Sequence, residues 1–188
     1  MEISRNQKIL FILLTAVIVT GISVPLILLN LNSLNNNSWT LTLKGEVSQE
    51  VSINLQDIYD ETYGTAYTRE FLYKNEYGTQ YTNEYTGIRL WDIIQNTSID
   101  IDTEADSFYF QGIDGWFSPI ISLSDLENNP EMFIVCFKEN GEFLKYKNEG
   151  GDGPLRAVVD FAITDPDPNA KYWSKYLAEI IFTIAPVE

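Results

Sequence analysis

The sequence contains no histidine and a single cysteine, Cys136, among its 188 residues. Without histidine the chain cannot build Ser-His-Asp or Cys-His catalytic groups, and it cannot ligate zinc or haem through imidazole. One cysteine allows neither an intrachain disulfide nor a metal site of several thiolates. Much of the common hydrolytic and metal chemistry is therefore excluded before any fold is considered.

Positive charge is also scarce. The chain has 12 Lys and Arg against 27 Asp and Glu, a formal charge of −15 at pH 7. Only Glu2, Arg5 and Lys8 are charged before Trp39, so residues 39–188 hold 10 basic and 26 acidic side chains, a formal charge of −16. A field of that sign repels phosphate backbones and argues against nucleic acid as a partner.

One long hydrophobic run lies near the N-terminus. Residues 9–29 form 21 consecutive positions without a charged side chain. A helix of that length spans the hydrocarbon core of a bilayer, which is roughly 30 Å thick. We predict a retained transmembrane anchor. The alternative is a cleaved signal peptide, which has a shorter apolar stretch followed by a small-residue cleavage site.

The residues around this run predict its orientation. Arg5 and Lys8 precede it, and the flank beyond it has neither Lys nor Arg. The positive-inside rule then predicts a cytoplasmic N-terminus over residues 1–8 and a domain on the extracytoplasmic side of the cell membrane. The Asn-rich residues 30–38 predict a polar tether. Residues 39–188 are left as a single domain.

The domain is predicted to be α+β and rich in strands. Strands are expected at residues 39–43, 107–111, 132–137, 156–163 and 178–184, with a further strand-and-loop region at 65–85. Short helices are expected at residues 54–58, at 87–94 and after Ser122. Asn140-Gly141 is a strong hairpin signal.

Six short motifs of this domain follow one another in an order that resembles a known family. They are residues 43–47 with 52–58, 85–94 (YTGIRLWDII), 114–116 (DGW), 140–144 (NGEFL), 153–159 (GPLRAVV) and 171–181. In this order they resemble the molybdopterin-binding domain of the sulfite oxidase superfamily. The resemblance covers about residues 42–183, and it implies that family's mixed-sheet fold.

The same resemblance implies molybdopterin as the cofactor, but the metal ligand is missing. In cofactor-binding members a cysteine thiolate ligates molybdenum shortly before the T-G-V-x-L element. The corresponding residues 71–81 contain no cysteine, and the histidines that help to hold the pterin are also absent. Cys136 follows Ile134 and Val135 and precedes Phe137, which predicts a buried and inert thiol. A bound molybdenum would therefore lack a protein thiolate.

Tyrosines recur at intervals of four residues. They are Tyr59, Tyr63 and Tyr67, followed by Tyr73, Tyr77, Tyr81 and Tyr85. One interpretation is an aromatic-lined cleft for a flat ligand. The other is β-propensity alone, because every fourth residue of a strand lies on the same face. The resemblance places this segment at the mouth of the cofactor pocket, so Tyr73, Tyr77 and Tyr81 are candidate binding residues.

The remaining candidate binding residues come from the resemblance to the G-P-x-R motif and from the scarcity of cations. Arg156 follows Gly153, and a guanidinium near a cofactor pocket can pair with an anion through two hydrogen bonds. Gly153, Arg69 and Arg89 are further candidates. The alternative for Arg156 is a structural ion pair with one of the many acidic side chains.

A calcium site is suggested by oxygen-bearing side chains at alternate positions of an acidic loop. Asp165, Asp167 and Asn169 occupy positions one, three and five. An EF-hand also requires Gly at position six and Glu at position twelve, where this chain has Ala170 and Tyr176. The alternative is an acidic loop made rigid by its two prolines.

Three functions remain open, and no catalytic residue can be named. The first is a binding module, for a small ligand or an extracytoplasmic protein, that has kept the fold and lost the metal site. The second is an active molybdopterin-dependent oxidoreductase. The third is a calcium-dependent surface protein.

Overall fold

The computed structural model describes residues 39–186. They belong to one compact unit, Trp39–Glu188. Within this described part of the chain, no helix is long and apolar enough to cross a membrane. The predicted anchor (9–29) and tether (30–38) lie outside the described residues.

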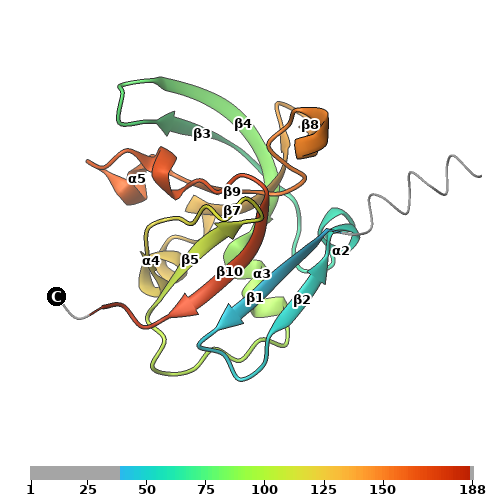
Figure 1. The fold of residues 1–188 in the computed structure, drawn as a ribbon, viewed down its shortest axis with the longest axis vertical. Helices are drawn as coiled ribbons and strands as arrows, with labels where there is room; N and C mark the ends of the chain where they lie inside the picture. Colours follow the sequence, from blue (N-terminus) through green and yellow to red (C-terminus); the bar gives the residue numbers. More distant parts are fainter. Residues whose placement is uncertain (1–38, 187–188) are drawn as a thin grey trace, which may run out of the picture. The chain divides into compact units, whose positions relative to one another are not determined.

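The described residues form ten strands, four α-helices and three short 3₁₀ helices (Figure 1). The strands are β1 Thr40–Gly45, β2 Val51–Asn54, β3 Tyr67–Lys74, β4 Gln80–Arg89, β5 Ser107–Gly112, β6 Ile121–Ser122, β7 Phe133–Glu139, β8 Glu142–Phe143, β9 Arg156–Val159 and β10 Leu177–Thr183. The α-helices are α2 Leu55–Tyr59, α3 Leu90–Asn96, α4 Leu123–Asn128 and α5 Phe161–Thr164. The 3₁₀ helices are Pro130–Met132, Lys147–Glu149 and Asn169–Tyr172.

The strands build two five-stranded sheets. The first has the order β2-β1-β10-β5-β6, with β1 and β10 parallel and the other neighbours antiparallel. The second has the order β3-β4-β7-β8, and β9 also pairs with β7; all its pairs are antiparallel. The predicted α+β class, with a mixed sheet, is confirmed.

Aromatic side chains from both sheets form the core. Phe108 and Phe110 of β5 and Phe182 of β10 are at most 1% exposed, as is Phe133 of β7. The ring centroids of Phe108 and Phe133 lie 6.1 Å apart in an edge-on contact, which joins the first sheet to the second. The alternating strand pattern therefore places its apolar face where it was expected, inside the domain.

The β3–β4 hairpin explains the tyrosine periodicity. Its turn is centred near Tyr77, where the Asn75 side chain accepts hydrogen bonds from the backbone N–H groups of Tyr77 and Thr79. Tyr73 then pairs directly with Tyr81 across the two strands. The four-residue spacing thus places Tyr73 and Tyr81 side by side on one face of a hairpin.

Two predicted elements were wrong in extent. Residues 87–89 belong to β4 and not to a helix, which begins only at Leu90. A Cβ on Gly87 would meet the Val135 carbonyl oxygen at 2.3 Å, so this glycine allows β4 and β7 to approach closely at an irregularity of their pairing. The predicted strand 156–163 ends at Val159, because the Asp160 side chain caps α5 by accepting from Ala162 N–H.

Candidate functional site

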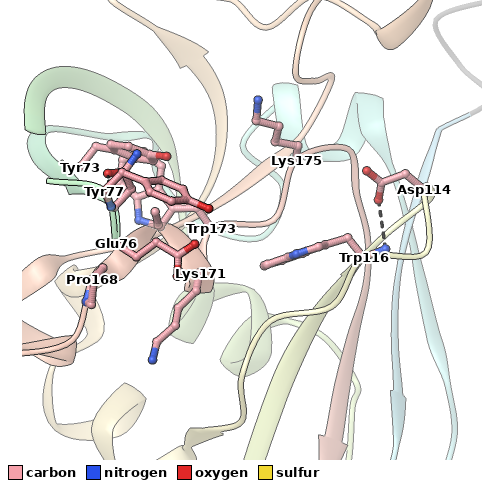
Figure 2. A pocket seen from close by; sticks show the side chains of 11 residues that line it. Tyr73, Glu76, Tyr77, Asp114, Trp116, Pro168, Lys171, Trp173 and Lys175 are labelled. Atoms are coloured by element: carbon pink, nitrogen blue, oxygen red, sulfur yellow. Dashed lines mark hydrogen bonds between the residues drawn. The ribbon is translucent and has the colours of Figure 1, made fainter. Parts of the chain in front are cut away.

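A cavity of about 480 Å³ lies where three separate segments meet. The end of β3 and the β3–β4 turn provide Tyr73, Asn75, Glu76 and Tyr77, the loop after β5 provides Asp114 and Trp116, and the segment before β10 provides Pro168, Ala170, Lys171, Trp173 and Lys175. Figure 2 shows Tyr73, Tyr77 and Trp173 together on one side, with Trp116 reaching toward them from the other. We call it the aromatic cavity.

One wall of the aromatic cavity is held firmly by packing. Trp173 is only 6% exposed, and its indole N–H donates to the Val159 carbonyl at 2.7 Å. Its ring meets Tyr73 and Tyr85 edge-on, with centroids 5.2 and 5.3 Å apart. Tyr73 in turn stacks on Tyr81 at 4.5 Å. A wall of interlocked rings is preorganised for a ligand and loses little entropy on binding.

Asn169 fastens the segment that carries this wall. Its side chain is fully buried, and its amide N–H₂ donates to the carbonyls of Leu72 at 2.6 Å and Val159 at 3.0 Å. Its oxygen accepts from the Lys74 backbone N–H at 2.8 Å. Asn169 therefore joins β3 and β9 to the segment that bears Trp173, and no part of the sequence pattern indicated this.

Each lysine of the aromatic cavity has an acidic partner outside the lining. Lys171 binds Asp167 at 2.7 Å, and this hydrogen bond, with weaker help from the charge of Glu76, raises the pKa of Lys171. Lys175 binds Asp152 at 3.0 Å. The cavity's own carboxylates, Glu76 and Asp114, take part in none of the salt bridges between described residues.

Arg156 is buried in a structural ion-pair cluster. Its guanidinium pairs with Asp152 and, at 3.4 Å, with Glu139, and it lies 5.9 Å from the centroid of the Tyr85 ring. Its Nε has no hydrogen-bond partner. The cluster borders a second, polar cavity of about 440 Å³. The ion pair that was the alternative for Arg156 is therefore present.

The other candidate residues divide into two groups. Tyr73 and Tyr77 line the aromatic cavity, and Tyr81 supports Tyr73 from behind. Arg69 instead pairs with Asp160 at 2.7 Å, and Arg89 pairs with Asp92 at 2.8 Å. Neither arginine lines either of the two cavities described.

Gly153 is buried behind the second cavity and does not line it. A Cβ there would lie 2.4 Å from the Leu144 Cβ, so this glycine serves the packing of the loop. The glycine-rich loop reaches the second cavity through Gly150 and Gly151 instead. A binding role for Gly153, Arg69 or Arg89 stays a prediction that the geometry does not favour.

Trp116 and Trp173 line the cavity but were not among the predicted site residues. The signal was available, because both stand in the D-G-W and K-Y-W motifs that carry the family resemblance. Nothing in a linear sequence indicated that these two motifs meet the β3–β4 turn.

The chemistry of these residues does not fit a thiolate-ligated molybdenum. Cys136, the sole thiol of the sequence, is fully buried in β7 and donates its S–H to the Lys138 carbonyl at 3.0 Å. Burial raises the pKa of this thiol to about 12. It lines neither cavity, so the predicted burial of this cysteine is confirmed, and its inertness stays a prediction. Tyr73 and its neighbours provide no soft ligand in its place.

The calcium hypothesis meets a similar obstacle. The side-chain oxygen of Asn169 is already bound to the Lys74 N–H, and Asp167 is paired with Lys171. Among residues 39–186 there is no group of three or more His, Cys, Asp or Glu side chains that could hold a metal ion.

The fold just described is that of a known class of domain. A model of the oxidoreductase molybdopterin binding domain matches residues 29–187. The chain therefore belongs to this family, part of the sulfite oxidase superfamily, as its motifs indicated.

A solved structure has the same fold. It is the crystal structure of the sulfane dehydrogenase SoxCD from Paracoccus pantotrophus, with a TM-score of 0.60 and 16% sequence identity. The similarity covers 81% of this chain and 40% of the SoxCD chain, so this chain spans less than half the length of that one. No curated protein matches this chain.

Proposed function

We propose that this protein is a membrane-anchored, extracytoplasmic binding module that keeps the molybdopterin-binding fold without a thiolate-ligated molybdenum. Its ligand is a small molecule with a flat or compact apolar surface, and it binds in the aromatic cavity. About 480 Å³ lies within the range of ordinary small-molecule sites, and several of the lining side chains are aromatic, as such sites require.

The burial of Cys136 is the observation that carries this proposal. A molybdenum centre in this superfamily needs a thiolate, and the sole thiol is fully buried, faces a backbone carbonyl and has a pKa of about 12. Releasing it would require β7 to leave both β4 and β9, its neighbours in the second sheet. The fold is therefore retained while the metal ligand is not.

A second candidate function is a molybdopterin-dependent oxidoreductase. The family match over residues 29–187 favours it. In that case the pterin would be held without a thiolate bond to its metal, by backbone groups of the glycine-rich loop and by the aromatic cavity.

Metal and pterin analysis separates the two candidates. The full-length protein is purified from its native host, and molybdenum is measured by plasma mass spectrometry and pterin by fluorescence after oxidation. We expect molybdenum far below one per chain. About one molybdenum and one pterin per chain would overturn the proposal and establish the oxidoreductase instead.

The proposed location rests on the apolar run 9–29 and on Arg5 and Lys8 before it. Protease added to intact cells should digest the domain, while a cytoplasmic marker stays whole. A domain that resists digestion until the membrane is opened would show the opposite orientation.

A further inference from the structure

Four aromatic rings line the aromatic cavity. Tyr73, Tyr77, Trp116 and Trp173 all line it, and Figure 2 shows Trp116 extending toward the other three across the cavity. A positive charge placed over such rings is attracted by their quadrupoles, most strongly by tryptophan. Neutral flat ligands gain from the same rings only by burial and stacking.

The charges around the rings point the same way. Glu76 and Asp114 line the cavity and form no salt bridge with any described residue. Their hydrogen-bond partners are neutral groups, because Asp114 accepts the Trp116 backbone N–H at 3.2 Å and Glu76 accepts from the Tyr77 hydroxyl. Lys171 and Lys175 are each bound to an aspartate that lies outside the lining. The lining therefore offers two carboxylates that no salt bridge neutralises, whereas each of its lysines is already paired with an aspartate.

An anionic ligand would meet the opposite conditions. No arginine lines the cavity, and Arg156, the buried arginine of the second cavity, is already held by Asp152 and Glu139. An anion would have to share Lys171 or Lys175 with the aspartate that each already binds. It would do so in the field of a domain whose formal charge is −16.

We infer that the aromatic cavity selects an organic cation, such as a quaternary ammonium or a protonated amine with an apolar body, over neutral and anionic molecules of the same shape. The inference rests on the proposed function, because a cavity filled by a pterin would not be free to bind a cation.

Three probes of nearly equal shape test the charge preference. They are choline, the neutral 3,3-dimethylbutan-1-ol and the anionic 3,3-dimethylbutanoate. The full chain in non-ionic detergent is titrated with each, and binding is followed by tryptophan fluorescence and by saturation-transfer NMR of the probe. We expect choline to bind about tenfold more tightly than the alcohol, and the anion not to bind measurably.

Variants locate the binding. Trp116→Ala should weaken choline binding about tenfold, and Glu76→Gln or Asp114→Asn about threefold each. Phe117→Ala is the matched control, because this neighbouring ring is 67% exposed and does not line the cavity. Glu127→Gln is the control for removal of an exposed carboxylate. Circular dichroism confirms that each variant folds.

Each outcome decides the inference. Choline binding that weakens in Trp116→Ala and not in Phe117→Ala supports it. Equal binding of choline and the alcohol would overturn the charge preference but leave a ligand-binding cavity, as the proposed function requires. The inference would also be overturned if the anion bound more tightly than choline, or if Trp116→Ala weakened the binding of none of the probes. The molybdenum content tests the proposed function separately.

Discussion

Arg156 is the most informative residue to replace, because the structure gives it a structural role where its sequence motif suggested a binding role. In Arg156→Met the buried guanidinium, whose side chain is 6% exposed, is replaced by an apolar chain of similar length. Glu139 would keep hydrogen bonds from Asn83 at 2.7 Å and from the Tyr85 hydroxyl at 2.9 Å. Asp152 would keep Lys175. Neither acid is left without a partner.

The expected loss follows from these remaining contacts. Removing one partner of a fully buried ion pair costs about 3–5 kcal/mol. The side chains of Glu139 and Asp152 are 27% and 31% exposed, so water can take over part of the lost interaction. We expect the free energy of unfolding to fall by about 2–3 kcal/mol, between the buried and the surface values. For a domain of this size that lowers the melting temperature by about 5–10 °C.

Urea denaturation of the full chain, followed by tryptophan fluorescence, measures this loss. Lys44→Met is the matched control, because it removes a surface pair with Glu179 at 2.8 Å whose loss should cost less than about 1 kcal/mol. A cycle with Asp152→Asn should show a coupling of about 1 kcal/mol or more with Arg156→Met. An Arg156→Met protein as stable as the wild type would refute the structural role and return Arg156 to the binding residues.

Three further predictions concern buried groups. The Cys136 thiol should react with a thiol reagent only as the protein unfolds, and rapid labelling of the native protein would contradict its burial. Because the thiol pKa is raised from 9.0 to about 12 in the folded chain, the contribution of this thiol to the free energy of unfolding should be fully present below pH 9 and be lost as the pH rises toward 12. In Cys136→Ala the urea midpoint should therefore fall less steeply with pH over this range. Asn169→Ala removes the Asn169 partner of the Leu72 carbonyl and of the Lys74 N–H, while the Val159 carbonyl keeps the Trp173 indole N–H. It should destabilise the domain by about 3 kcal/mol in urea denaturation, whereas an unchanged midpoint would show that water replaces the amide.

Elements fixed by local chemistry were predictable from the sequence. Asn140-Gly141 predicted the β7–β8 hairpin, and both residues adopt the positive φ values, 51° and 82°, that such a turn needs. Ser122 was predicted to open a helix, and its hydroxyl accepts the Ser124 N–H at the start of α4. The prediction failed at Gly87, where a contact with a neighbouring strand determines the local structure. Gly87 stands in a helical pattern of the sequence, but in the fold it lies in β4 and packs closely against β7.

By itself the sequence determined the acidic charge, the absence of histidine and the absence of a thiol at the family's metal position, because these depend only on which residues are present. It also indicated the family, through motifs that keep their order. Only the tertiary structure decided which candidate residues meet. Tyr73, Trp116 and Trp173 are separated by more than 40 residues in the chain and line one cavity, while Arg156 is bound to Asp152 and Glu139. Such long-range contacts follow from the pairing of strands and the packing of loops, which no local pattern encodes.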